Sequence, residues 1–194
     1  PGDAAGYVAL SALYLSRGDS AAAKVLLHRA VTVAPSDPAG HLGLARAYAL
    51  AGEADLAEQA FRQATETRPG SSLPYLQLGD WYWSRGAIKA AEQAFRQAVA
   101  ATPADPDGYI RLGQLFQSQG RAEDALAQFE AATAIAPSYV DGYVQLGNWY
   151  EGQGDARAAE DSYVLAVAAA SMVSDNRPSR PITSSVESRI TGGG

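Results

Sequence analysis

The sequence predicts an all-α protein built from repeated pairs of helices. Three observations support this fold class. The chain matches itself at an offset of 34 residues, apolar residues recur at helical spacing within each unit, and glycine and proline fall at fixed places between the apolar stretches. Five units follow one another without a gap, over 4–37, 38–71, 72–105, 106–139 and 140–173.

The repeat is visible as columns of one residue type or one size class. The most regular columns are Leu10, Leu44, Leu78, Leu112 and Leu146; Gly18, Gly52, Gly86, Gly120 and Gly154; Ala23, Ala57, Ala91, Ala125 and Ala159; and the bulky Leu27, Phe61, Phe95, Phe129 and Tyr163. So many columns at one spacing do not arise by chance.

The spacing of apolar residues predicts the first helix of each unit. In the fourth unit, Tyr109, Leu112, Gly113 and Phe116 stand at i, i+3, i+4 and i+7, which is one side of a helix. Gly120 follows at a position where glycine adopts a left-handed cap. The pairs Asp37-Pro38 and Asp105-Pro106 predict helix starts, with Asp as the cap and Pro in the first turn.

The second helix of the same unit is expected from Ala122 to Ile135, and Pro137 stops it because proline disfavours helical backbone in the residue before it. Glycine in the middle of first helices, at Gly79, Gly113 and Gly147, costs about 1 kcal/mol each relative to Ala. We expect that cost where a large side chain of the partner helix needs the space.

These residues resemble the tetratricopeptide repeat (TPR) pattern, which the third unit matches at Tyr75, Leu78, Gly79, Tyr82, Gly86, Ala91, Phe95, Ala98 and Pro103. The resemblance covers about residues 4–171. It implies a right-handed superhelical solenoid of helix-turn-helix repeats, with first helices lining a concave groove. The sequence departs from the pattern at four positions: Ser11 and Ala45 replace the helical Gly, His41 replaces the first aromatic, and Ser171 replaces the last Pro.

Composition removes several function classes. The 194 residues include no Cys and two His, which leaves no thiolate site and too few ligands for a His-rich metal site. A net charge of −6 does not favour nucleic acid, and no apolar run approaches the roughly 20 residues of a membrane span. The acidic pairs Glu123-Asp124 and Glu160-Asp161 are expected on solvated faces. We therefore expect no catalytic residues, no metal and no cofactor.

The resemblance implies that variable positions on the first helices face a ligand. Amide side chains there can both donate to and accept from an extended peptide; the other interpretation is that they only solvate the groove. A clamp for a terminal carboxylate is not expected, since the lysine column is apolar (Leu42, Leu76, Ile110). Trp81 and Trp149 are expected between repeats, and Trp83 either in the core or in the groove. The groove candidates are Arg46, Gln77, Asp80, Trp83, Arg111, Gln114, Gln145 and Asn148.

Neither end of the solenoid carries the polar outer face that a terminal repeat needs. The first helix is apolar nearly all round, and 163–173 is similarly apolar. One hypothesis is head-to-tail association of copies into a fibre or ring through the uncapped ends, with the C-terminal tail strapping the junction or entering a neighbour's groove. The competing hypothesis is a peptide-binding adaptor excised from a larger protein. The assembly candidates are Tyr7, Val8, Leu13, Leu15, Val164, Val167, Val173, Ile182, Val186 and Ile190.

The segment 174–194 differs from the repeats, being rich in Ser, Thr, Pro and Arg, and is predicted to be a non-helical tail. Its composition favours disorder. Ile182 to Ile190 nevertheless alternates as a strand would, and the apolar spacing also permits a helix. The tail is slightly basic and the remainder acidic, which favours contact between them. The first residue is Pro1, which suggests a processed or excised product. The absence of Cys fits an exported protein, and the high Ala content suits a bacterial source.

Overall fold

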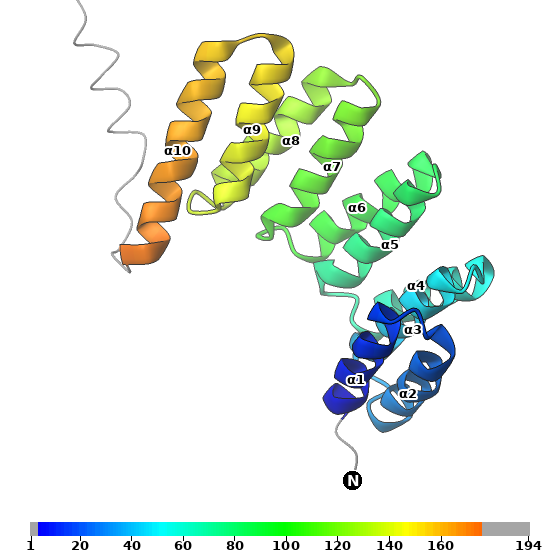
Figure 1. The fold of residues 1–194 in the computed structure, drawn as a ribbon. Helices are drawn as coiled ribbons and strands as arrows, with labels where there is room; N and C mark the ends of the chain where they lie inside the picture. Colours follow the sequence, from blue (N-terminus) through cyan, green and yellow to red (C-terminus); the bar gives the residue numbers. More distant parts are fainter. Residues whose placement is uncertain (1–3, 176–194) are drawn as a thin grey trace, which may run out of the picture. The chain divides into compact units, whose positions relative to one another are not determined.

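The computed structural model describes residues 4–175, which form ten α-helices and no strands within that range (Figure 1). The chain divides into two compact units, residues 1–102 and 103–194. The first unit contains α1 (Ala4–Ser16), α2 (Ser20–Val33), α3 (Pro38–Leu50), α4 (Ala54–Thr67), α5 (Ser72–Ser84) and α6 (Ile88–Ala101). The second contains α7 (Pro106–Ser118), α8 (Ala122–Ile135), α9 (Val140–Gln153) and α10 (Ala156–Asp175).

Within each unit, helices pair and the pairs stack in sequence order. In the first unit, α3 packs against its partner α4, against α2 of the preceding pair, and against the neighbouring first helices α1 and α5. In the second unit, α9 packs against α10, α8 and α7 in the same way. The first helices α3, α5 and α9 therefore each have one side covered by the helix pair before them. This is the all-α helical-repeat solenoid expected from the sequence.

The turn inside every helix pair depends on one glycine. Gly18, Gly52, Gly86, Gly120 and Gly154 all have positive φ, between +72° and +82°. This left-handed conformation is disfavoured for residues with a Cβ. The left-handed glycine predicted at Gly120 is confirmed, and the equivalent glycines of the other four helix pairs have the same conformation.

The starts of α3 and α7 form as predicted. The Asp37 carboxylate accepts a hydrogen bond from the Ala39 amide at 3.0 Å, and Asp105 accepts one from the Asp107 amide at 3.1 Å. In both helices the first residue is proline, whose fixed φ suits the first turn. The second helix α8 ends at Ile135, two residues before Pro137, as expected.

The mid-helix glycines make room for aromatic rings. A Cβ at Gly79 would collide with the ring of Phe95, and one at Gly113 with the ring of Phe129; both rings are fully buried. Gly147 lies against Tyr163 in the same way. The loss of helix propensity at these glycines is thus offset by close packing within each helix pair.

The last helix is longer than the other second helices. α10 has 20 residues, whereas α2, α4, α6 and α8 have 14 each. Ser171 stands where the earlier units have proline, so no stop signal ends the helix at that point. Residues 174 and 175, predicted as the start of a non-helical tail, are helical; the rest of the predicted tail lies outside the described residues.

Candidate functional site

The outer face of α1 exposes leucines at positions that are buried elsewhere. Leu10 is 44% exposed, whereas Leu44, Leu78 and Leu146 at the same position of later repeats are 4%, 6% and 8% exposed. Leu13 is 46% exposed, while its equivalent Ala47 is fully buried. These later positions lie on first helices that pack against a preceding pair in the same unit. The α1 face therefore presents an inter-repeat surface without a preceding repeat among the described residues.

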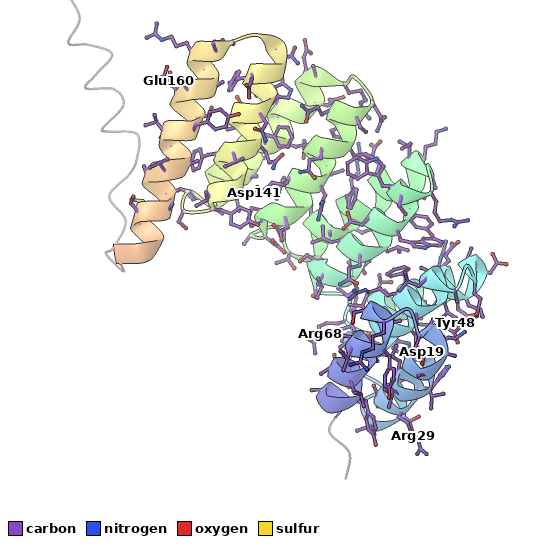
Figure 2. All side chains as sticks on the ribbon, viewed as in Figure 1. Asp19, Arg29, Tyr48, Arg68, Asp141 and Glu160 are labelled. Carbon is purple, nitrogen blue, oxygen red and sulfur yellow. The ribbon has the colours of Figure 1, made fainter. Side chains whose placement is uncertain are left out.

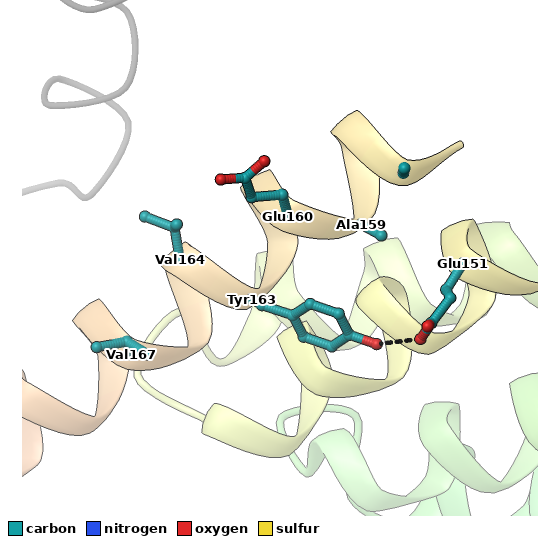
Figure 3. Close-up of a pocket in the computed structure, with 7 residues that line it drawn as sticks. Glu151, Ala159, Glu160, Tyr163, Val164 and Val167 are labelled. Carbon is teal, nitrogen blue, oxygen red and sulfur yellow. Dashed lines mark hydrogen bonds between the residues drawn. The ribbon is translucent and has the colours of Figure 1, made fainter. Parts of the chain in front are cut away.

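The second unit presents an apolar groove on α10. It has a volume of about 480 Å³, and its lining residues are Glu151, Ala156, Ala159, Glu160, Tyr163, Val164 and Val167. Figure 3 shows Glu160, Val164 and Val167 along one side of α10, pointing away from α9, whereas Tyr163 points toward Glu151. The Tyr163 hydroxyl has two acceptors within reach of its one proton, the Asn148 side-chain oxygen at 2.8 Å and a Glu151 carboxylate oxygen at 3.0 Å. This fixes the inner wall of the groove.

Two exposed valines, Val164 and Val167, make this groove apolar. Val167 is 69% exposed. The equivalent Val31 lies against Gly40 of the next helix pair, and Thr133 lies against Gly142. Val164 is 50% exposed and stands where earlier second helices carry His28, Arg62, Arg96 and Glu130. The fifth repeat therefore has an apolar residue, Val164, where earlier repeats have a polar surface residue. Val164 lies beside Val167, whose equivalents contact the next helix pair in earlier repeats.

Polar first-helix residues form a chain in the second unit. An Arg111 nitrogen donates to the Gln114 carbonyl at 3.4 Å, Gln114 donates to Gln145 at 3.2 Å, and Gln145 donates to Asp141 at 3.2 Å. Asp141 lies at the start of α9 (Figure 2). The chain links α7 to α9, so it joins neighbouring repeats.

The other predicted groove residues have different surroundings. In the first unit, Arg46 is exposed, and Gln77 and Asp80 are half-buried. Trp83 packs edge-on against Phe95 of its own repeat, with ring centroids 6.3 Å apart, so its ring belongs partly to the core. Asn148, in the second unit, accepts the bond from Tyr163 described above. The ring centroid of Trp81 lies 5.7 Å from that of Phe61 in the preceding repeat, and Trp149 is buried. Both observations agree with the expectation that these rings pack between repeats.

The predicted assembly residues divide into exposed and packed groups. Val8 and Leu15 are half-buried and pack against the core of their own unit. Tyr7 is half-buried, and Leu13, Val164 and Val167 are exposed. The side chain of Val173, and all of Ile182, Val186 and Ile190, lie outside the described residues. Leu10 was missing from the prediction, although its place in a leucine column without a preceding repeat could have identified it.

Family models match the chain in two blocks. A tetratricopeptide repeat model matches residues 14–81, and a second tetratricopeptide repeat model matches 76–140. The chain belongs to the tetratricopeptide repeat family. Repeats of this family are generally interaction modules without catalytic activity, so the TPR fold indicates a protein-interaction scaffold or adaptor.

Solved structures agree with the TPR fold. Pseudomonas aeruginosa pilF is 20% identical, with a TM-score of 0.67, over 86% of this chain and 76% of its own. MamA from Desulfovibrio magneticus RS-1 is 22% identical, with a TM-score of 0.61, over 87% and 96%. YrrB, a TPR protein with an unusual peptide-binding site, is 20% identical, with a TM-score of 0.55, over 86% of each chain. No curated protein sequence matches the chain.

Two further features of this TPR protein concern ions and membranes. Across residues 4–175, no three His, Cys, Asp or Glu side chains come together as metal ligands would.

Burial lowers the pKa of His41, and a hydrogen bond with Gln63 opposes this in part. In the same range, no helix combines the length and apolar character needed to cross a bilayer.

Proposed function

We propose that this TPR protein is a non-enzymatic scaffold whose copies associate head to tail, with α1 of one copy docking on α10 of another. The observation that carries the proposal is the exposure of Leu10, whose equivalents are buried wherever a helix pair precedes them in the same unit. The α10 end offers the matching surface, because Val167 occupies the position that contacts the next pair in earlier repeats.

The energetics support a reversible association. Full burial of an exposed Val or Leu side chain contributes about 1.5–3 kcal/mol. Because Leu10, Leu13, Val164 and Val167 are each only 44–69% exposed, together they contribute roughly 3–6 kcal/mol. Association costs about 4–15 kcal/mol in lost translational and rotational freedom. The two ranges overlap, so these side chains favour association at high protein concentration and a monomer on dilution.

The two docking surfaces are different, and this determines the kind of assembly. A contact between unlike surfaces is heterologous, and it leads to rings or open filaments rather than closed two-fold dimers. An open chain of copies retains an unused α1 face at one end and an unused α10 groove at the other. Growth beyond a dimer is therefore expected.

Sedimentation velocity across a dilution series tests the proposal. We expect the wild-type chain to shift from monomer to larger species between low and high micromolar concentration. The variant Leu10→Asp/Leu13→Asp places two charges in the contact and should remain monomeric. Val25→Asp is the matched control, since Val25 is 67% exposed on the second helix α2. A wild-type chain that is monomeric throughout, or a control that dissociates equally, contradicts the proposal.

A second candidate function is the binding of an extended peptide, favoured by the polar chain Arg111–Gln114–Gln145–Asp141. Its amides bond one another across neighbouring first helices, and a peptide backbone can offer the same donors and acceptors. Selection from a peptide display library tests it. Gln114→Ala/Gln145→Ala should abolish capture of selected peptides while Gln128→Ala, on the second helix α8, retains it. Equal capture by both variants contradicts peptide binding at this site.

A further inference from the structure

The groove on α10 combines an apolar surface with acidic side chains. Val164 and Val167 point outward from the helix, and Glu160 lies on the same side one turn before Val164 (Figure 3). Glu151 closes the groove from α9. A ligand that fits this groove needs two or three apolar side chains on one face and positive charges beside them.

The chain itself supplies such a segment directly after α10. Residue 180 is Arg where the repeats have Leu, and residue 184 is Ser where they have an aromatic, so the sequence does not continue as a sixth repeat. Instead, Ile182, Val186 and Ile190 recur every fourth residue. This spacing places all three on one face of a helix, and also on one face of a strand, since four is an even number.

The charges of the same segment complement those of the groove. Residues 176–194 contain three arginines (Arg177, Arg180 and Arg189) and a single acidic side chain, Glu187. The groove carries Glu151 and Glu160. Attraction between these groups adds specificity to the apolar contact, although exposed ion pairs contribute only about 0–1 kcal/mol each.

The geometry of α10 allows the segment to reach the groove of its own chain. Val167 lies eight residues before the end of α10 at Asp175, or about 12 Å along the helix. The seven residues from Asp175 to Ile182 extend up to about 25 Å. Pro178 and Pro181 fall in this connection, and proline disfavours continuation of a helix. The chain therefore has both the length and the break that a reversal along α10 requires.

We infer that residues 182–190 dock in the α10 groove of their own chain, with Ile182, Val186 and Ile190 covering Val164 and Val167. Because the head-to-tail proposal places α1 of another copy on the same valines, the segment competes with association. That competition rests on the proposed function, whereas the docking itself does not.

Disulfide trapping in the full chain tests the docking, because the protein has no native cysteine. Val167→Cys/Val186→Cys should oxidise to an intramolecular disulfide in most molecules at submicromolar concentration. Val25→Cys/Val186→Cys, with the first cysteine on exposed α2, should remain mostly reduced under the same conditions. Equal oxidation of the two variants, or disulfides found only between chains, overturns the docking.

A second variant tests the competition. Ile182→Ser/Val186→Ser/Ile190→Ser removes the apolar face of the segment and leaves residues 4–175 intact. If the groove is covered about nine-tenths of the time, the triple variant should associate at about tenfold lower concentration than wild type. An unchanged midpoint overturns the competition. An intramolecular disulfide in a protein that never associates retains the docking and contradicts the head-to-tail proposal.

Discussion

Leu10 and Leu44 occupy the same position of successive repeats, yet Leu10 is 44% exposed and Leu44 is 4% exposed. The two residues differ in what precedes them: α3 packs against α1 and α2, and the described residues contain no helix pair before α1. The same side chain is therefore a core residue in one repeat and an exposed apolar group in another.

The first prediction concerns the stability contribution of these two leucines. Leu44→Ala should lower the free energy of unfolding by about 2–5 kcal/mol, since it leaves a cavity in the core cluster of the first unit. Leu10→Ala should lower it by less than about 1 kcal/mol when the protein is monomeric. Urea unfolding at submicromolar concentration measures both. Equal losses would show that Leu10 is already covered within its own chain.

The second prediction concerns the turn glycines. Gly52 has φ +77°, and no atom lies within 4 Å of the Cβ that an alanine would add there, so only backbone strain opposes Gly52→Ala. That strain should cost about 1–2 kcal/mol. Gly70 is a matched position with equally open space and no positive φ, so Gly70→Ala should be neutral or stabilising by about 0.4–1 kcal/mol. The urea midpoint of Gly52→Ala should fall and that of Gly70→Ala should not, and an equal fall in both variants contradicts this.

The third prediction concerns a hydrogen bond in the second unit that joins the start of α7 to the residue before α9. The Tyr139 hydroxyl donates to the Asp107 carboxylate at 2.5 Å, and this bond, with partial burial, raises the pKa of Tyr139 far above its usual range. Tyr139→Phe should lower the free energy of unfolding by about 1 kcal/mol at pH 7. Tyr109→Phe is the control, since its hydroxyl donates a longer bond of 3.3 Å to the Pro103 carbonyl.

The same bond has a defined pH dependence. Because the folded-state pKa of Tyr139 is raised, its contribution is fully present below the unfolded-state pKa of about 10 and is lost as pH rises further. The difference in unfolding free energy between wild type and Tyr139→Phe should therefore shrink above about pH 10. Urea titrations at pH 7, 9 and 11 measure it, and a difference that grows with pH contradicts the assignment.

The fourth prediction separates folding from docking at Val164. Equivalent positions carry exposed Arg62 and Arg96, so Val164→Arg restores the usual residue type of the repeat. The free energy of unfolding, measured by urea titration, should change by no more than about 0.5 kcal/mol, as for most surface substitutions. Association by sedimentation should weaken at least tenfold, which corresponds to about 1.4 kcal/mol. A variant that associates as wild type does would remove Val164 from the contact.

The fold could be predicted in detail because its signals are local and repeated. Gly120 marks a left-handed turn, Asp105 and Pro106 mark a helix start, and Gly113 opposite Phe129 marks close packing; the structure has each of these. One repeat also predicts the next, so an ambiguous position in one unit is resolved by its equivalent in another.

The site was harder to predict, since exposure depends on neighbours rather than on residue type. Val8 and Leu15 have the same apolar character as Leu13, but they face their own core and Leu13 does not. Residue spacing places Trp83 in either the core or the groove. In the structure its ring packs partly against the core through an edge-on contact with the Phe95 ring. The hydrogen bonds among Arg111, Gln114 and Gln145 depend on side-chain rotamers, which residue spacing does not specify.

A mixing experiment tests the head-to-tail contact most directly. Leu10→Asp/Leu13→Asp disables the α1 face and retains the α10 groove; Val164→Asp/Val167→Asp does the reverse. We predict that each variant alone sediments as a monomer at high micromolar concentration, and that an equimolar mixture forms a dimer that grows no further. A mixture that remains monomeric while wild type associates, or a single variant that still forms long assemblies, would contradict the contact between α1 and α10.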